Sequence, residues 1–270
     1  MRSRQLLCLT FLVALLTGCS AGSTGGVSVL SQSPAPTSAT APEQPPSSPP
    51  VATPVLPARV VVIDPGHNGG NAAAPDEINR PVPDGNGGTK PCNTVGTSTN
   101  AGYAEHAFNW AVALAVRDLL TAQGVEVVLT RSDDVGVGPC VDQRAAVADQ
   151  AAAAAFVSIH ADGSAPGNRG FHVITSNLDP AGSDIGAASD ALAVAVRDEM
   201  TSVLSASNYI GSDGLNARDD LAGLNLNLRP AIYLECGNMR DATDAALLTS
   251  GSGQAAIAAA VAAGVLRLLG

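Results

Sequence analysis

The sequence predicts a three-layer α/β domain with a mostly parallel, twisted central sheet and helices on both faces. Short apolar runs rich in β-branched residues recur along the chain and are expected as strands at 60–63, 125–130, 156–159, 171–175 and 231–235. Longer segments with helical spacing of apolar residues lie between or after them, at 105–123, 141–153, 185–205 and 254–269. Strands that are apolar throughout and alternate with helices are typical of a parallel sheet buried on both faces.

The first expected strand ends abruptly, in a way that exposes a histidine. Four consecutive Val and Ile residues at 60–63 are followed closely by Pro65 and Gly66, and His67 is the next side chain. Proline cannot donate a hydrogen bond to a sheet and glycine accepts almost any backbone twist, so the strand stops there. Ligands of open α/β sheets bind at the carboxyl ends of strands, which makes His67 a candidate ligand-binding residue.

The helical segments carry sequence signals at their ends. The segment 105–123 is apolar on almost every side, and Gly124 after it suits the end of a helix. The segment 185–205 repeats an apolar residue every third or fourth position behind Asp184, a possible N-cap. Helices therefore separate most of the expected strands, as crossover connections in a parallel sheet require.

The amino-terminal residues 1–19 have the pattern of a signal peptide. Two arginines precede an apolar run that is too short to span a bilayer as a mature helix. The run ends in Leu16-Thr17-Gly18-Cys19, which resembles the bacterial lipobox, so Cys19 is the expected site of lipidation and membrane anchoring. The alternative is an ordinary secretory signal in which Cys19 is incidental. Both alternatives predict an exported protein of the cell envelope.

Residues 20–58 have a composition that does not support a packed core. They consist largely of Ser, Thr, Ala, Gly and Pro, and Glu43 is their only charged residue. Such a stretch buries too little apolar surface to offset the entropy of ordering it. We therefore expect a disordered tether at 20–58 and a single catalytic domain at 59–270.

The charge of the chain excludes one class of partner. The formal net charge is −10 at pH 7, so the protein lacks the basic surface that nucleic-acid binding requires. The sequence indicates solubility more than any protein partner. It does not determine the oligomeric state, although a monomer is favoured.

The cysteines predict one disulfide bond. Cys92 and Cys140 each lie in a loop rich in Gly, Pro or Asn, whereas Cys236 lies in an expected buried strand. In an oxidising compartment the two loop cysteines are the natural pair, and Cys236 is expected to stay reduced. No CxxC spacing occurs in the chain, which argues against a zinc site made of cysteines.

Polar side chains at strand ends predict a catalytic metal site. His67, His160 and Glu235 each follow an apolar run and are expected at the same edge of the sheet. Glu105 starts the first long helix, which should begin near the end of the first strand. Two imidazoles and one carboxylate with an open fourth position form a catalytic zinc site, and a second carboxylate can act as general base. His106 is an alternative to Glu105, because adjacent helical residues point about 100° apart and cannot easily both face one ion.

Five stretches of the chain carry a family resemblance. They lie at 61–67, 105–109, 129–131 with Arg144, 156–162 and 230–238. In this order they resemble the zinc-dependent N-acetylmuramoyl-L-alanine amidases of the type 3 family, which are bacterial peptidoglycan hydrolases. The agreement extends across nearly all of residues 60–270.

The resemblance implies an activity and a role for each site residue. His67, Glu105 and His160 would bind one zinc ion, and Glu235 would be the catalytic glutamate. The reaction would be hydrolysis of the amide between N-acetylmuramic acid and the L-alanine of the stem peptide, in peptidoglycan or muropeptides. Glu235 would take a proton from the attacking water and later protonate the leaving amine.

The segment between the first histidine and Glu105 departs from the family pattern because it is long. It is rich in Gly, Asn, Pro and Thr and contains Cys92. We expect residues 71–100 to form an inserted loop at the rim of the site, held by the disulfide and limiting which glycan or peptide enters.

Two other functions are compatible with parts of the sequence. One is another zinc peptidase of similar architecture, although such enzymes usually hold two metals and need more histidines at strand ends. The other is a non-catalytic envelope lipoprotein that binds peptidoglycan, which the presence of Glu235 disfavours.

Four further residues have candidate roles in or near the site. Arg229, just before the last strand, could meet a carboxylate of the substrate. Arg131 and Arg144 are expected to be structural partners of aspartates. His172 alternates with apolar residues and is expected to face solvent or to be satisfied by a hydrogen bond.

Overall fold

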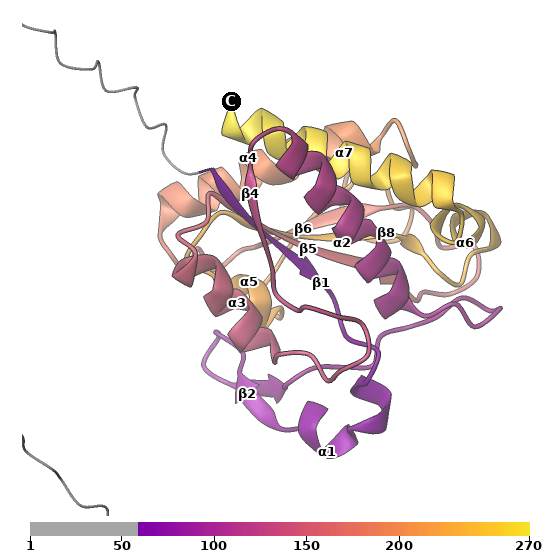
Figure 1. Cartoon of the computed structure of the whole chain (residues 1–270), viewed down its shortest axis with the longest axis horizontal. Helices are drawn as coiled ribbons and strands as arrows, with labels where there is room; N and C mark the ends of the chain where they lie inside the picture. The colour runs from indigo at the N-terminus through magenta and orange to yellow at the C-terminus, as the bar shows by residue number, and fades with distance from the viewer. Residues whose placement is uncertain (1–58) are drawn as a thin grey trace, which may run out of the picture. The chain divides into compact units, whose positions relative to one another are not determined.

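The computed structural model describes residues 59–270 (Figure 1). The predicted signal peptide at 1–19 with Cys19, and the predicted tether at 20–58, lie outside the described residues. They remain predictions from the sequence alone.

The centre of the domain is a six-stranded sheet. Its strands lie side by side in the order β4 (Glu126–Leu129), β1 (Val60–Pro65), β5 (Ala155–Asp162), β8 (Ala231–Asn238), β6 (His172–Ser176) and β7 (Leu215–Arg218). The first four strands in this order are parallel, β6 pairs antiparallel with β8, and β7 runs parallel to β6. The predicted mostly parallel sheet is confirmed.

Helices cover both faces of the sheet, as predicted (Figure 1). One face packs against α2 (Glu105–Ala122), α4 (Ser183–Met200) and α7 (Gly251–Leu269). The other face is covered by α3 (Val141–Gln150) and the short helix α5 (Ala222–Asn225). Alternate residues of β1 point to the two faces: Val61 and Ile63 belong to the larger core, and Val62 to the smaller one.

Helix α7 combines a membrane-like composition with a place in the protein core. Among residues 59–270 it is the one helix long and apolar enough to cross a membrane. Its residues Ile257, Val261 and Val265 are fully buried in the larger core against α2 and α4. The position of α7 is that of a core helix of the α/β domain.

Several short elements were not predicted from the sequence. The insertion before α2 contains η1 (Asn71–Ala73), α1 (Pro75–Ile78) and a hairpin of β2 (Pro81–Pro83) and β3 (Thr89–Pro91). Strand β7, helix α5 and helix α6 (Ala242–Leu248) were also missed. Each is shorter than the window over which hydrophobic periodicity can be recognised, so tertiary packing decides whether it forms.

Candidate active site

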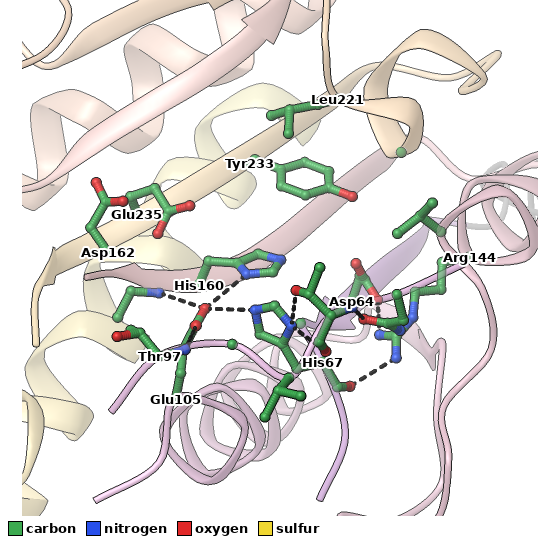
Figure 2. A pocket seen from close by; sticks show the side chains of 18 of the residues that line it. Asp64, His67, Thr97, Glu105, Arg144, His160, Asp162, Leu221, Tyr233 and Glu235 are labelled. Atoms are coloured by element: carbon green, nitrogen blue, oxygen red, sulfur yellow. Dashed lines mark hydrogen bonds and ion pairs between the residues drawn. The ribbon is translucent and has the colours of Figure 1, made fainter. Parts of the chain in front are cut away.

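Three neighbouring parallel strands carry the polar residues of the candidate site. β1, β5 and β8 lie side by side, and His160 is directly opposite Glu235 in the register of β5 and β8. His67 follows the end of β1 at the same edge of the sheet (Figure 2). The structure therefore brings together the strand-end residues that the sequence singled out.

The turn after β1 allows His67 and His160 to approach each other closely. His67 has a φ of 59°, a left-handed conformation that is uncommon for a residue with a side chain. Gly66 lies against the His160 ring, where an added Cβ would come within 2.1 Å of Cε1. Only glycine at position 66 leaves room for the imidazole of His160.

Arg144, a residue of α3, holds this turn in place through hydrogen bonds. Its guanidinium donates hydrogen bonds to Asp64 Oδ1 at 2.7 Å and to the carbonyl oxygens of Pro65 and His67, each at 2.8 Å. Burial would raise the pKa of Asp64, but the charge of Arg144 and bonds from two hydroxyls hold that pKa below its usual value. Arg144 is a structural partner of an aspartate, as expected.

Arg131 also stabilises the turn after β1. It donates to the carbonyl oxygen of Pro65 at 2.9 Å and forms an ion pair with Asp134, also at 2.9 Å. His106 is the other partner of Asp134, at 2.8 Å. His106 is thus engaged away from the other imidazoles, and Glu105 rather than His106 joins the group of candidate ligands.

His67, Glu105 and His160 form a group that can hold a metal ion. Glu105 Oε1 lies 3.0 Å from His67 Nε2 and 2.9 Å from His160 Nδ1. One ligand atom from each residue lies within 4.8 Å of the others. Two imidazole nitrogens and one carboxylate oxygen are a donor set that catalytic zinc takes, so the residues fit this ion.

The charges within this group stabilise one another. Burial would raise the pKa of Glu105, but the imidazoles of His67 and His160 hold it well below its usual value. Burial by itself would lower the pKa of His67, but the Glu105 carboxylate raises this pKa above its usual value. Glu105 is therefore an anion in the folded protein, as a metal ligand must be.

Glu235 has the opposite environment. Part of its surface faces the cleft, but Oε2 is buried and has no hydrogen-bond partner. Burial and the neighbouring carboxylates of Asp162 and Glu105 raise its pKa well above the usual value. Figure 2 shows Glu235 beside Asp162, across the cleft from Glu105. A carboxyl with a raised pKa is suited to general acid–base chemistry.

Two residues near Glu235 were missed or misread from the sequence. Asp162 lies at the end of β5 and accepts a hydrogen bond from the hydroxyl of Tyr209. The expectation for His172 is wrong: it is buried, and its Nδ1 has no hydrogen-bond partner, with Asp162 Oδ2 3.7 Å away. Because β6 runs antiparallel to β8, its first residue lies opposite Glu235 instead of at the far edge.

The three candidate ligands line a cleft of about 470 Å³ together with Asp162 and Glu235. The insertion contributes one wall, including Lys90 and Thr94, and α5 with the residue before it contributes another, including Leu221. The two walls are joined by a hydrogen bond from Lys90 Nζ to the carbonyl oxygen of Asp220, at 2.8 Å. The 71–100 segment therefore lies at the rim of the site.

The predicted disulfide is present. Cys92 and Cys140 are bonded, and Cys236 is buried and free. The bond joins the insertion to the N-cap residue of α3, the helix that carries Arg144. The disulfide thus connects the insertion at the rim of the cleft to α3, whose Arg144 holds the turn that carries His67.

Arg229 is not part of this cleft. It precedes β8 and therefore lies at the amino end of a strand whose carboxyl half carries Glu235. Its guanidinium forms an ion pair with Asp149 of α3 at 3.0 Å. A residue before a strand and one near its end lie at opposite edges of the sheet, so the structure places Arg229 outside the cleft. Its contact with a substrate carboxylate stays a prediction from the sequence.

The fold and the site define an α/β domain with a candidate metal-binding, hydrolytic cleft. The family model described as N-acetylmuramoyl-L-alanine amidase matches residues 61–267. The chain belongs to this family.

The chain is similar to named amidases of mycobacteria. It is 47% identical over 211 residues to N-acetylmuramoyl-L-alanine amidase Rv3717 of Mycobacterium tuberculosis, covering 78% of this chain and 86% of the relative. The structure of the amidase Ami1 from Mycobacterium smegmatis matches with a TM-score of 0.74 and 45% identity, covering 78% of this chain and 96% of that one.

A second solved structure agrees equally well. The apo form of Ami1 from Mycobacterium abscessus matches with a TM-score of 0.75 and 45% identity, over 80% of this chain and all (100%) of that one. The architecture described above is therefore an amidase fold.

Proposed function

We propose that this protein is a zinc-dependent hydrolase that cleaves the amide between N-acetylmuramic acid and L-alanine in peptidoglycan or muropeptides. One observation carries the proposal: His67, Glu105 and His160 converge on one point, and Glu235 lines the same cleft. Membership of the amidase family supports the choice of bond.

His67, Glu105 and His160 would hold the zinc ion through Nε2, Oε1 and Nδ1, the atoms that already face one another. The bound ion would supply Lewis-acid activation of water and of the scissile carbonyl at neutral pH. Asp64 and Arg144 would keep His67 oriented by fixing the turn that presents it. The preorganised turn lowers the cost of assembling the site.

Glu235 would be the residue that moves the proton. Its unpartnered Oε2 and its raised pKa allow the carboxyl to accept a proton from water and keep it until the amine leaves. Proton transfer to the leaving nitrogen would then restore the carboxylate for the next cycle. In this scheme Asp162 is a neighbour that raises the pKa of Glu235 and does not contact the scissile bond.

Mass analysis of reaction products tests the activity. Muropeptides are incubated with the 59–270 domain, with and without a zinc chelator, alongside Glu235→Gln as a variant of equal size. We expect free stem peptides with L-alanine at the amino terminus, lost on chelation and in the variant. Cleavage at another bond, or cleavage that survives chelation, would overturn the proposal.

We also propose that the protein is exported to the cell envelope and anchored through a lipid on Cys19. The support is the signal-like sequence of residues 1–19 and the disulfide, which forms in oxidising compartments. Membrane fractionation tests it: the full chain should sediment with membranes, and Cys19→Ala should release it. A soluble wild-type protein would contradict the anchor.

The insertion is proposed to restrict the substrate. Its hairpin reaches α5, where Asn225 Nδ2 donates to the carbonyl oxygen of Asp84 at 3.1 Å. Shortening the hairpin turn at 84–88 would open this wall without touching the residues beside the ligands. The ratio of kcat/KM for polymeric peptidoglycan to that for small muropeptides should rise; an unchanged ratio would refute the idea.

A further inference from the structure

The segment from Cys92 to Thr97 passes directly over two of the three candidate metal ligands. The carbonyl oxygen of Thr94 lies 3.1 Å from His67 Nδ1. The backbone N–H of Thr97 donates to Glu105 Oε2 at 2.9 Å, and Thr97 in return accepts from the backbone N–H of Glu105. Figure 2 shows Thr97 and His67 on either side of Glu105.

These contacts select which atom of each ligand is free for a metal. When Nδ1 of His67 donates to Thr94, the lone pair of the ring lies on Nε2, which faces Glu105 Oε1 at 3.0 Å. The N–H of Thr97 occupies Oε2 of Glu105 and leaves Oε1 pointing toward both imidazoles. Partners of this kind orient metal ligands in proteins and strengthen metal binding.

Gly96 allows the segment to come this close. Its φ is +82°, and an added Cβ would lie 2.7 Å from Glu105 Oε2 and 2.8 Å from His67 Cδ2. Any side chain at this position would displace the segment or the ligands. The close approach is thus built into the sequence.

The segment is anchored at its first residue and in its middle. The disulfide bonds Cys92 to Cys140, and the N–H of Val141 donates to the carbonyl oxygen of Cys92 at 2.8 Å. The buried Asn71 side chain donates to the carbonyl oxygen of Thr94, also at 2.8 Å. Because the loop has little regular structure of its own, these anchors determine where Thr94 and Thr97 lie.

We propose that the disulfide-anchored 92–97 segment is a positioning element for the metal ligands, so that the zinc affinity of the site depends on the Cys92–Cys140 bond. The inference rests on the zinc binding proposed above. The disulfide acts on both sides of His67: through Thr94 on the imidazole, and through α3 and Arg144 on the backbone carbonyl. A protein whose disulfide is reduced would hold zinc more weakly than the oxidised form.

Zinc affinity of Gly96→Ala tests the proposal, measured by competition with a chromogenic chelator. We expect a fall of about 10–100-fold, the usual loss when a partner of a metal ligand is disturbed. The matched control is Gly87→Ala in the same insertion, where φ is also positive at +85° but an added Cβ has nothing within 4 Å. Its affinity should equal that of the wild type.

A second variant keeps the test valid if Gly96→Ala does not fold. The double substitution Cys92→Ser with Cys140→Ser releases the anchor without adding bulk beside the ligands. Circular dichroism of the metal-free proteins verifies folding, and zinc affinity is then compared with the wild type. A folded double variant, or a folded Gly96→Ala, with wild-type affinity would overturn the proposal.

The two proposals fail in different ways. A wild-type protein that binds no zinc would refute the zinc-dependent function itself. A wild-type protein that binds zinc and cleaves muropeptides, with Gly96→Ala indistinguishable from Gly87→Ala, would refute only the positioning role.

Discussion

Glu105 and Glu235 line the same cleft but occupy opposite environments. Glu105 faces two imidazoles and a backbone N–H, and these groups hold its pKa well below the usual value. Glu235 faces the carboxylate of Asp162 and has an oxygen without a partner, and its pKa is raised well above the usual value. The same residue type is thus kept as an anion in one place and prepared to carry a proton in the other.

The difference teaches how roles can be assigned within a cleft. Two carboxyl groups whose surroundings move their pKa values apart serve different steps of one reaction. Glu105 suits a metal ligand because its lowered pKa keeps it ionised, and Glu235 suits an acid–base group because its raised pKa lets it hold a proton. Substitutions at each glutamate can break or sharpen this contrast.

The largest effect is expected from Glu235→Gln. Loss of the general base should lower kcat for muropeptide cleavage by about 10²–10⁴-fold, because the side-chain amide of the glutamine cannot accept the proton from water. Zinc affinity should stay within a few-fold of wild type, since Glu235 is not among the converging ligand atoms. A variant that retains activity would remove Glu235 from the mechanism.

Glu105→Ala should chiefly affect metal binding. Zinc affinity should fall by more than about 100-fold, because losing a ligand costs more than losing one of its supporting partners. Chelator competition measures this fall, and Glu235→Gln serves as the control that keeps affinity. If the two variants bound zinc equally well, the contrast between the glutamates would be wrong.

Glu235→Gln should also make the metal-free protein more stable at neutral pH. In the unfolded chain the carboxyl has the ordinary glutamate pKa of 4.5, whereas the folded one keeps its proton to higher pH. Wild-type stability therefore falls as the pH rises above that value, and the variant avoids this loss. The gain should grow as the pH rises above 4.5, because the folded wild-type protein then holds a proton that the unfolded chain releases.

Denaturant unfolding at several pH values measures this gain. The difference between variant and wild type should shrink toward pH 4, where the wild-type carboxyl is protonated in both states. Glu105→Gln should show the opposite sign at neutral pH, because the lowered folded pKa of Glu105 stabilises the protein above the unfolded value and is lost on acidification. Equal signs for the two variants would contradict the assigned environments.

The smallest effect is expected from Arg229→Ala. Its ion pair with Asp149 is partly exposed and lies before the start of β8, away from Glu235. The free energy of unfolding should therefore change by about 0–1 kcal/mol. KM for muropeptides should not change. A raised KM would make Arg229 a substrate contact after all.

Much of the candidate site could be predicted from the sequence because strand ends are visible in it. The apolar runs before His67, His160 and Glu235 define three buried strands, and parallel strands place their ends at one edge. Glu105, at the start of the first long helix, was the fourth residue, and the family resemblance favoured it over His106. These are local patterns, and the sheet topology then brought them together.

Residues contributed by irregular or antiparallel segments could not be predicted in this way. The burial of His172 depends on the direction of β6, which no local pattern reveals. The role of Thr94 and Thr97 comes from backbone atoms, and every residue has the same backbone groups. The position of Arg229 outside the cleft could not be predicted either, because its closeness to Glu235 in sequence hides the length of the strand between them.

The sequence by itself determined the α/β class and the order of the main elements, and it singled out the candidate ligand and acid–base residues. Tertiary structure alone decided the strand order, the closing of the cleft by the insertion and the opposite pKa shifts of Glu105 and Glu235. The reason is physical. Hydrophobic periodicity and the signals that end a strand or helix act over a few residues, whereas the burial and the pKa of a side chain depend on neighbours distant in the chain.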